Sequence, residues 1–500
     1  MSIRTASPES AGIPSAKIEE YLRLLEENHL VTHDILIMRG NDLIFETYVP
    51  PFTKEQTHRM YSVSKSFVAL AVGFALDDGL LSLDDPMEKF FAKELEGQED
   101  EHLRHQTVRN MLMMSTGKPA MNWFVNRSDN RVRQYFQNPD KRTRIPGAAF
   151  EYDSSGSFVI GALVERLTHM EFMDYLRMKL FDKIGVSKDA HCLHCPGGHS
   201  WGDSACLMQP RDLLLTARFV LNGGSWDGEQ LLSADYVRDA TSNLISTAPG
   251  GGAPSLSGKA DEQGYGYYFW KTWGKGFYFN GMGCQFAVCI PEKDLILVYN
   301  GDNQGNSAAG ECIIRNFFEI VAQSAGDVLP EAPEAQKSLS DFASSMKLCA
   351  AWEDAVPADG LMAKIDGKVY TLSENPMGIS WFRFDFDADG GVFSYENAQG
   401  GKNFAFGFRE NRFGIFPQAG YSNDVGSVPG TVPYRCAASA SWTDASTLRM
   451  KVQLMSDYFG NFDAYFTFSP DAERVSLSMR KTAEDFLNEY QGSAEGTLKK

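Results

Sequence analysis

Residues 66–76 form an almost unbroken apolar run, long enough for about three turns of helix. A helix that is apolar around nearly its whole circumference must be enclosed by other elements, because any exposed face would leave hydrocarbon in water. The run therefore predicts a helix inside a core, with further structure packed around it. The 500-residue chain can supply that structure. At roughly 100–200 residues per domain, we expect about two to four domains.

The four residues before this run, Ser62-Val63-Ser64-Lys65, place a serine three positions ahead of a lysine. On a helix these side chains share a face one turn apart, so the amine can reach the hydroxyl. A serine hydroxyl becomes a useful nucleophile when a neighbouring base takes its proton, and burial favours the uncharged amine of lysine. If Ser62 opens the helix, its backbone N–H also points toward any anion formed there. The alternative interpretation is a capping serine with a solvated lysine.

The net charge of −18 argues against binding to nucleic acids or anionic membranes, which requires basic surfaces. No stretch approaches the roughly 18 uninterrupted apolar residues that a transmembrane helix needs. The first ten residues lack the apolar segment of a secretory signal. These observations predict a cytoplasmic protein.

The order of the predicted elements indicates an α+β fold. A helix is expected at residues 15–25, and two strands around a Gly-Asn turn at 34–46. Mostly helical segments follow to about residue 240, and strands return at 264–270, 286–290 and 295–299. The pattern predicts an antiparallel sheet begun by the N-terminal part, interrupted by a helical insertion and completed near residue 300. A helix over 312–322 is expected to cover it.

Prolines and charges at residues 327–334 are typical of a linker. Beyond it, after a short helix, turn residues separate alternating strands such as 448–454 and 462–468. We expect a small antiparallel barrel or sandwich, similar to a lipocalin. The predicted division of the chain is a catalytic domain at 1–325, a linker and short helix at 326–352, and a β-rich domain at 353–500.

Several runs around the Ser-x-x-Lys motif resemble one family. They are residues 58–67, 79–86, 107–117, 180–186 and 209–213. Together they resemble the serine hydrolases that share the class C β-lactamase and penicillin-binding-protein fold, over roughly residues 5–325. The resemblance implies an antiparallel sheet flanked by helices, a helical subdomain, and an acyl-enzyme formed on Ser62 without a metal or organic cofactor.

The second element of that family is Tyr-x-Asn or Tyr-x-Ser, and Tyr152-Asp153-Ser154 matches it. The resemblance implies that Lys65 and Tyr152 remove and return the serine proton, since a phenol near an ammonium group is favoured as phenolate. Ser154 is then expected to hold the network by hydrogen bonding. The alternative for Tyr152 is a half-buried aromatic residue whose hydroxyl is satisfied locally.

The third element of the family, Lys-Thr-Gly or His-x-Gly, is where this chain departs. The corresponding stretch is 279–286, and no histidine follows His199. Lys271 begins Lys-Thr-Trp-Gly, which lies too early and lacks glycine in third place. The cation that grips a substrate carboxylate is therefore missing, as in the esterase and amide-hydrolase branches of the family. Gly281 and Gly283 permit close approach of the backbone, so Met282 N–H is the expected second oxyanion donor.

These features predict a serine hydrolase acting on a small ester, amide or peptide-like substrate. A β-lactamase or a D-amino-acid-specific peptidase is the alternative. From another class, a binding or scaffold protein could keep this fold without turnover.

Two further patterns suggest metal sites. Residues 385–390 with Glu396 match a calcium loop, but strand-like flanks favour an Asp- and Gly-rich hairpin turn. Cys192-Leu193-His194-Cys195 has a spacing seen in zinc sites, with His191, His199 and Cys206 nearby. Because the second half of such a site is lacking, free thiols without metal are predicted.

Overall fold

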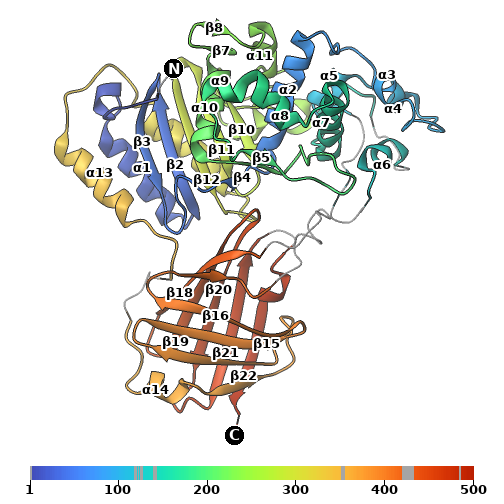
Figure 1. Ribbon diagram of the computed structural model, residues 1–500. Coiled ribbons are helices and arrows are strands. Elements are labelled where there is room, and N and C mark those ends of the chain that lie inside the picture. Colours follow the sequence, from blue (N-terminus) through green and yellow to red (C-terminus); the bar gives the residue numbers. More distant parts are fainter. Residues whose placement is uncertain are drawn as a thin grey trace. The chain divides into compact units, whose positions relative to one another are not determined.

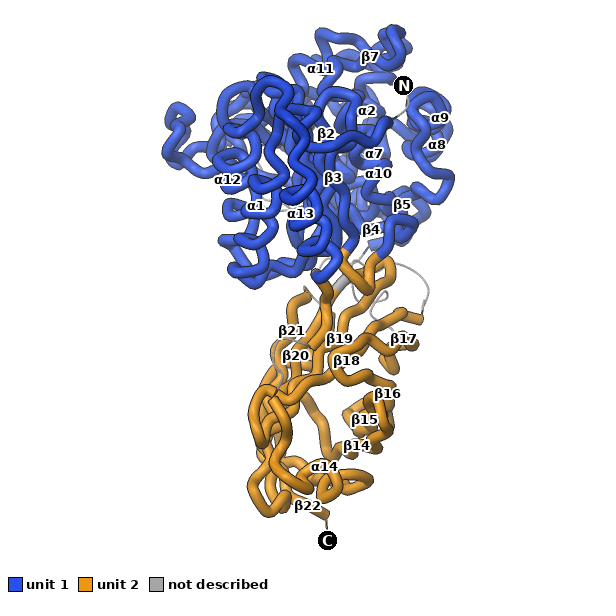
Figure 2. The backbone as a smooth tube through the Cα atoms, turned by 90° about the vertical axis from the view of Figure 1, so that its left-hand side faces the viewer, with its two compact units in different colours: residues 1–48, 53–345, 426–429 blue, residues 49–52, 346–425, 430–500 orange. Residues whose placement is uncertain are grey.

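The computed structural model describes residues 3–116, 121, 123, 128–138, 144–350, 355–418, 433–483 and 486–499. The chain forms two compact units (Figure 2). The first contains the described residues up to 48 and from 53 to 345, and the second those at 49–52 and from 346 onward. The division predicted at 1–325, 326–352 and 353–500 stays a prediction.

The first unit is built on a seven-stranded sheet in which strands from both ends of the unit pair directly. The strand order is β1 (Arg4–Thr5), β3 (Asp42–Tyr48), β2 (Thr32–Arg39), β12 (Leu295–Gly301), β11 (Gln285–Ile290), β10 (Phe277–Gly281) and β9 (Trp270–Lys271). All neighbours are antiparallel except β1 and β3. The register that joins the two ends pairs Leu297 with Ile37. This confirms the predicted α+β sheet.

Helices fill the chain between β3 and β9. The helices of the first unit are α1 (Ser15–Glu27), α2 (Val63–Asp77), α3 (Glu88–Phe91), α4 (Glu101–His105), α5 (Val108–Leu112), α6 (Arg131–Gln137), α7 (Ser154–Thr168), α8 (Phe172–Leu176), α9 (Asp182–Ile184), α10 (Pro210–Leu221), α11 (Ala234–Ala240), α12 (Ala309–Asn316) and α13 (Pro333–Ser345). Short strands pair as β5 (His191–Cys192) and β4 (His58–Arg59) on either side of β6 (Cys206–Met208), and as β7 (Ser225–Trp226) with β8 (Glu229–Gln230).

Shorter helical turns join these elements. The 3₁₀ turns are Glu9–Ala11, Pro249–Gly251, Ala260–Glu262, Pro291–Lys293 and Asn488–Tyr490, and π-helical turns lie at Arg177–Phe181 and Phe317–Ala322. The helix expected at 312–322 is thus α12 continued by a π turn. Among the described residues, no helix is long and apolar enough to cross a membrane.

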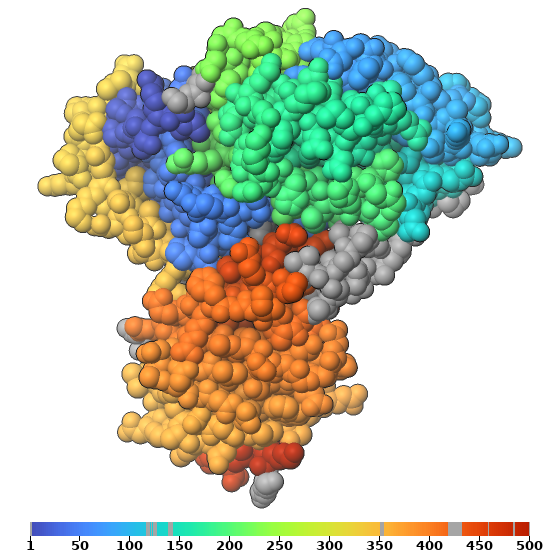
Figure 3. All heavy atoms as spheres, viewed as in Figure 1, coloured from blue at the N-terminus to red at the C-terminus, as the bar shows by residue number. Residues whose placement is uncertain are grey.

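The sheet lies between two helical layers. Figure 2 shows α1 and α12 on one side of β2 and β3, with α7, α8 and α10 on the other. Helix α10 contacts β2, β11 and β12 (Figure 1), and green atoms of the helical segments cover much of the first unit in the space-filling view, beside blue atoms from the N-terminal part (Figure 3). Helix α13 packs on α1, where the Arg23 guanidinium lies 4.2 Å from the centroid of the Phe342 ring.

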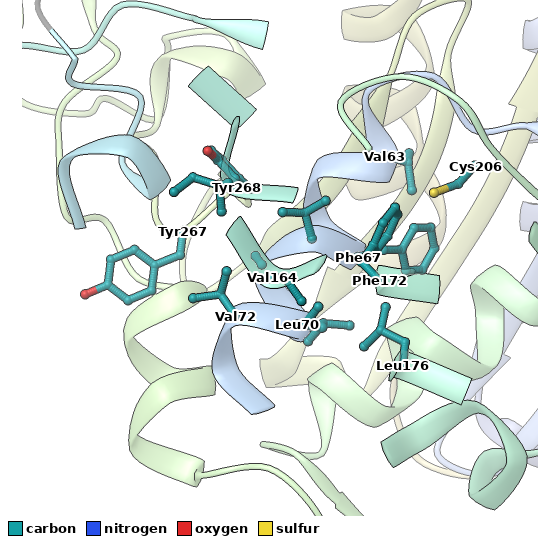
Figure 4. Close-up of a cluster of buried hydrophobic side chains, with 14 of the residues drawn as sticks. Val63, Phe67, Leu70, Val72, Val164, Phe172, Leu176, Cys206, Tyr267 and Tyr268 are labelled. Carbon is teal, nitrogen blue, oxygen red and sulfur yellow. The ribbon is translucent and has the colours of Figure 1, made fainter. Parts of the chain in front are cut away.

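Helix α2 is the buried helix that the apolar run predicted. Every residue from Val63 to Ala75 is buried, and the helix contacts α7, α8 and β10 (Figure 4). Gly73 is required where α11 crosses, because a Cβ atom there would lie 2.5 Å from the Tyr236 ring. The Tyr236 hydroxyl donates a hydrogen bond of 2.7 Å to the Ala69 carbonyl. The nucleophile motif therefore begins a helix that packing holds on all sides.

The strand expected at 264–270 is wrong for most of its length. Only Trp270 belongs to a strand there, and Tyr265 makes isolated bridges to Ile245 and Trp270. The tyrosines of this segment are held by aromatic packing and not by a continuous series of strand hydrogen bonds. The rings of Tyr265 and Trp270, for example, meet edge to face at 5.0 Å.

The second unit is a ten-stranded sheet that closes on itself. Its strands are β13 (Val369–Leu372), β14 (Trp381–Asp387), β15 (Gly390–Asn397), β16 (Gly400–Phe408), β17 (Arg412–Ile415), β18 (Arg435–Trp442), β19 (Thr447–Met455), β20 (Phe459–Phe468), β21 (Arg474–Thr482) and β22 (Gly492–Leu498), with the short helix α14 (Leu361–Ile365) beside them. The sheet is antiparallel, and a parallel pairing of β16 with β18 closes it. This confirms the small β-barrel expected for the C-terminal part.

The calcium-loop pattern lies in the β14–β15 hairpin, where Asp387 pairs with Gly390. Both nitrogens of the Arg412 fork donate to Asp387, at 2.7 Å each, and this lowers the pKa of Asp387 to about 2. The predicted hairpin turn is confirmed. All eight cysteines are free thiols, and the described residues contain no group of three or more metal-ligating side chains.

Asp34 of β2 and His58 of β4 form a buried pair. Asp34 Oδ2 lies 3.3 Å from His58 Nε2, and both side chains are fully buried. His58 Nδ1 lies 3.3 Å from the Gln56 carbonyl, which leaves Nε2 as the acceptor, and Asn300 donates to Asp34 Oδ1 at 2.8 Å. Burial raises the pKa of Asp34 well above its usual range and lowers the pKa of His58 to about 4. Both shifts favour a pair that keeps its proton on Asp34 and leaves His58 neutral.

This retained proton predicts that the free energy of unfolding falls as the pH rises above about 6.5, where the unfolded histidine loses its proton. The raised pKa of Asp34 contributes stability at low pH, and this contribution is lost as the pH rises. The lowered pKa of His58 contributes stability above about pH 6.5, and this contribution is lost as the pH falls below that value. Between about pH 4 and 6.5 the folded and unfolded pairs each hold one proton, so the two effects cancel. Above that range the pair contributes a negative slope of at most about 1.4 kcal/mol per pH unit.

Urea unfolding of the wild type and of Asp34→Asn at about pH 5.5, 7 and 8 measures this slope. The amide can donate to His58 and accept from Asn300 without titrating, so the variant should show a flatter profile than the wild type. Parallel profiles would show that the pair holds no extra proton in the folded state.

Candidate active site

Ser62 and Lys65 meet at the N-terminal end of α2. Lys65 Nζ donates a hydrogen bond of 2.9 Å to Ser62 Oγ. The lysine is only 1% exposed, and Ser62 is partly exposed. Ser62 occupies the N-cap position of α2 but makes no capping hydrogen bond through its side chain. The alternative of a capping serine with a solvated lysine is therefore wrong.

The backbone just before Ser62 is held in an unusual conformation. Tyr61 has φ +45°, in the left-handed region that non-glycine residues seldom adopt. Its hydroxyl lies 3.2 Å from Gln304 Nε2, and the Arg59 guanidinium lies 5.0 Å from the centroid of its ring. These contacts fix the turn that presents the Ser62 hydroxyl.

Tyr152 faces the lysine from the segment that precedes α7. Lys65 Nζ lies 5.1 Å from the centroid of the Tyr152 ring, which stacks on Trp270 at 5.9 Å. Asp153 caps α7 by accepting from Gly156 N at 3.0 Å and from Thr116 Oγ1 at 3.1 Å. The buried cap fixes the position of Tyr152 next to it.

Ser154 is the first residue of α7, and its carbonyl accepts from Ser157 Oγ at 2.8 Å. Among the described residues, the Ser154 side chain makes no hydrogen bond to Ser62, Lys65 or Tyr152. The structure thus brings Ser62, Lys65 and Tyr152 together and leaves Ser154 out of their direct contacts. The supporting role of Ser154 stays a prediction.

The third predicted element is the turn from β10 to β11, and its first glycine touches the nucleophile segment. A Cβ atom at Gly281 would lie 2.3 Å from the Met60 carbonyl, two residues before Ser62. Gly283 has φ +76°, and its carbonyl accepts from Asn303 N at 3.1 Å. Gln285 Nε2 donates to the Met282 carbonyl at 3.1 Å, which fixes the peptide after Met282. The turn is therefore a rigid backbone element beside the start of α2.

Lys271 lies far along the strands from this turn. It pairs with Phe277, at the opposite end of β10 from Gly281, and its Nζ donates to the Lys275 carbonyl at 2.9 Å. Burial lowers the pKa of Lys271 to about 8. This strand register places Lys271 away from the β10–β11 turn, in agreement with its exclusion from the third motif.

A pocket of about 360 Å³ adjoins the same turn. Its lining includes three side-chain amides, two carboxylates and one amine around Met282, namely Asn280, Asn303, Gln304, Asp261, Glu311 and Lys259. Side-chain amides can both donate and accept hydrogen bonds, so the wall combines uncharged polar groups with charges of both signs.

One contact of the lysine was not foreseen in the sequence. Lys65 Nζ also donates to the main-chain carbonyl of Asp203, at 2.6 Å. The two residues are 138 positions apart, and Asp203 lies outside the three motifs that resemble the family. No sequence signal marks it, because a carbonyl acceptor can be supplied by any residue.

Known proteins support the assignment of the fold. A 6-aminohexanoate-dimer hydrolase of Paenarthrobacter ureafaciens is 23% identical over 237 residues, which cover 45% of this chain and 60% of that relative. A Bacillus anthracis structure provisionally named a 6-aminohexanoate-dimer hydrolase matches with a TM-score of 0.51 at 15% identity, over 64% of this chain and 86% of that one. A Bacteroides dorei structure provisionally named a β-lactamase matches with a TM-score of 0.51 at 16% identity, over 61% and 97%.

The family comparison covers the site as well as the sheet. The match to the model described as Beta-lactamase runs over residues 21–311, which include Ser62, Lys65, Tyr152 and the turn at Met282. The chain therefore belongs to the β-lactamase family of hydrolases.

Proposed function

We propose that this protein is a serine hydrolase that cleaves short linear amides or esters through an acyl-enzyme on Ser62. The observation that carries the proposal is the 2.9 Å hydrogen bond between Lys65 Nζ and Ser62 Oγ, made by a lysine that is 1% exposed. A buried amine in direct contact with a hydroxyl is the arrangement that general-base activation of serine needs.

In the first step Ser62 Oγ attacks the substrate carbonyl carbon, and its proton passes to Lys65 Nζ. We assign this proton to Lys65 because its amine is hydrogen-bonded to Oγ at 2.9 Å, whereas among the described residues no hydrogen bond joins Tyr152 to Ser62 or Lys65. The carbonyl π pair moves onto oxygen, where the N–H groups of Ser62 and Met282 are the proposed donors.

Collapse of the tetrahedral adduct expels the amine or alcohol, which takes a proton through Lys65 and Tyr152. Water then attacks the acyl-enzyme, gives up a proton to the same groups and restores the Ser62 hydroxyl. The products are a carboxylic acid and an amine or alcohol, so atoms and charge balance without a metal or organic cofactor.

One observation supports a substrate that carries no carboxylate for the site to bind: the β10–β11 turn contains neither lysine nor histidine. The adjoining pocket is lined by three amide side chains and also by Lys259, Asp261 and Glu311. The Paenarthrobacter relative is named as a hydrolase of a 6-aminohexanoate dimer, an amide that itself carries a carboxylate when one amide bond joins its halves, and 60% of its length is matched. This name supports an amide bond as the target. The turn without a cation favours an amide or ester over a β-lactam held by its carboxylate.

The test is a substrate panel with a fluorophosphonate probe. We expect the probe to label the wild type, and short linear amides and nitrophenyl esters to be turned over at least about tenfold faster, in kcat/KM, than a chromogenic cephalosporin. Faster turnover of the cephalosporin would instead support a β-lactamase. Faster turnover of peptides that contain D-amino acids would support a peptidase. Absence of both labelling and turnover would establish a binding or scaffold protein.

A further inference from the structure

We propose that Cys192 and Cys206 are a redox-sensitive dithiol, and that a disulfide between them closes the loop that brings the Asp203 carbonyl to Lys65. The inference goes beyond the proposed function, because it concerns a modification of the loop and does not depend on hydrolysis. It gives a role to two cysteines whose spacing in the sequence suggested only a metal site.

The two cysteines face each other across a pair of short antiparallel strands. Cys192 of β5 is the register partner of Cys206 of β6. One residue further along each strand, Leu193 N donates to the Ala205 carbonyl at 3.0 Å, so the two cysteines form a pair without mutual backbone hydrogen bonds. The Cα atoms of such pairs lie about 4.5 Å apart, and a disulfide spans Cα separations of about 4.4–6.8 Å. The backbone therefore already has the spacing that a disulfide needs.

The two side chains lie on the same face of the strand pair, as residues directly opposite each other do. Cys192 is 5% exposed and Cys206 is fully buried, and both belong to the main core cluster of the first unit, in which Figure 4 draws Cys206. Burial, and then a hydrogen bond with the Cys206 thiol, raises the pKa of the Cys192 thiol. The two sulfurs are therefore neighbours in an apolar region, which suits an uncharged disulfide.

A bond between the two sulfurs would close the loop of residues 192–206, which contacts the nucleophile motif at two places. The Asp203 carbonyl accepts from Lys65 Nζ at 2.6 Å. Cys206 N donates to Ser64 Oγ at 3.0 Å. Because the strand pair already has the required spacing, the disulfide would hold the loop against the start of α2 without moving either contact.

Formation of the bond releases two protons and two electrons, and a low-molecular-weight disulfide accepts both as it is reduced to two thiols. One protein thiolate attacks this reagent to form a mixed disulfide, and the second thiol then displaces the remaining half of the reagent. We expect Cys192 to react first, because β5 is an edge strand and β6 lies between β4 and β5. Burial raises the pKa of Cys192, so oxidation should be slow at neutral pH and faster at about pH 9.

The experiment compares the folded protein after treatment with dithiothreitol and with oxidised glutathione at about pH 8.5, with the remaining thiols blocked before digestion. Cleavage of the denatured protein after Trp201 separates the two cysteines, so mass spectrometry should find a linked pair of peptides that dithiothreitol releases. The oxidised protein should melt about 5 °C or more above the reduced protein, because the bond restricts the unfolded chain. A glutathione adduct without an internal bond, or unchanged thiols, would overturn the inference.

Cys195→Ser is the matched control. Cys195 lies in the same loop, is 2% exposed, and has a thiol whose pKa burial raises to about 11. This variant should keep both the crosslink and the rise in melting temperature, whereas Cys192→Ser should lose both. A bond to Cys195, or an oxidised wild type that melts no higher than the reduced protein, would contradict the inference. Absence of Ser62 labelling, in contrast, would bring down the proposed function and leave these thiol and melting results unaffected.

Discussion

Replacement of Ser62 with alanine is expected to lower kcat/KM for an amide or ester substrate by on the order of 10⁴-fold or more. The hydroxyl supplies the atom that forms the acyl bond, and among the described residues it is the only nucleophilic group hydrogen-bonded to Lys65 Nζ, at 2.9 Å. The variant can still bind substrate in its pocket and still has the backbone N–H groups proposed to hold the oxyanion, so a small residual rate is expected. Steady-state kinetics and mass spectrometry of the trapped acyl-enzyme give the two readouts.

Ser66→Ala is the matched control for that variant. Ser66 lies on the same buried helix, and its Oγ donates to the Tyr268 carbonyl at 2.7 Å, away from the reacting groups. Its loss should lower the free energy of unfolding by about 1 kcal/mol and leave kcat/KM within about twofold. A Ser62→Ala protein that keeps both its turnover and a covalent adduct would contradict the assignment of the nucleophile.

Replacement of Gly281 with alanine is expected to have the largest effect of any single methyl group added to the site. The new Cβ would lie 2.3 Å from the Met60 carbonyl and 3.0 Å from Gln285 Cβ. Neither neighbour can rotate away, because Met60 N is bonded to Cys206 O and Gln285 is fully buried in β11. The strand and the nucleophile segment must therefore separate.

We expect a loss of about 2–3 kcal/mol in the free energy of unfolding, as for overpacked cores, and a fall in kcat of roughly 10²-fold from the displaced oxyanion donor. Urea unfolding and steady-state kinetics measure the two effects. Gly326→Ala is the control, because nothing lies within 4 Å of a Cβ atom there, and it should change stability by less than about 0.5 kcal/mol. If the two variants had the same free energy of unfolding and the same kcat, the close contact between Gly281 of β10 and Met60 would be contradicted.

The features that the sequence predicted well are local. The burial of α2 follows from apolar residues on every face, and the approach of Lys65 to Ser62 follows from the helical repeat. The hairpin at residues 385–390 was recognisable because alternation on both flanks outweighed the resemblance to a calcium loop. In each case the residues that interact lie within a few positions of each other, so spacing alone carries the information.

The errors and omissions concern contacts between distant segments. Residues 264–270 look like a strand, yet Tyr265 and Trp270 both pack on Phe150, far earlier in the chain, and the residue types that favour strands favour such aromatic packing equally well. The closure of the second unit depends on a parallel pairing between Gly407 and Ser439, for which no periodicity exists. Side-chain alternation reports which face is buried, but not which strand lies alongside.

By itself the sequence determined the Ser62–Lys65 pair and its buried helix, the tyrosine at 152 that faces the amine, and the division into an α+β part followed by a β-rich part. Only the tertiary structure decided that Gly281 presses on Met60 and that Asp203, 138 residues away, accepts from Lys65. The physical reason is that a helix fixes neighbours three residues apart through its own geometry. Contacts with a carbonyl or a glycine depend on how loops and strands from distant parts of the chain are packed, and those groups carry no side-chain signal.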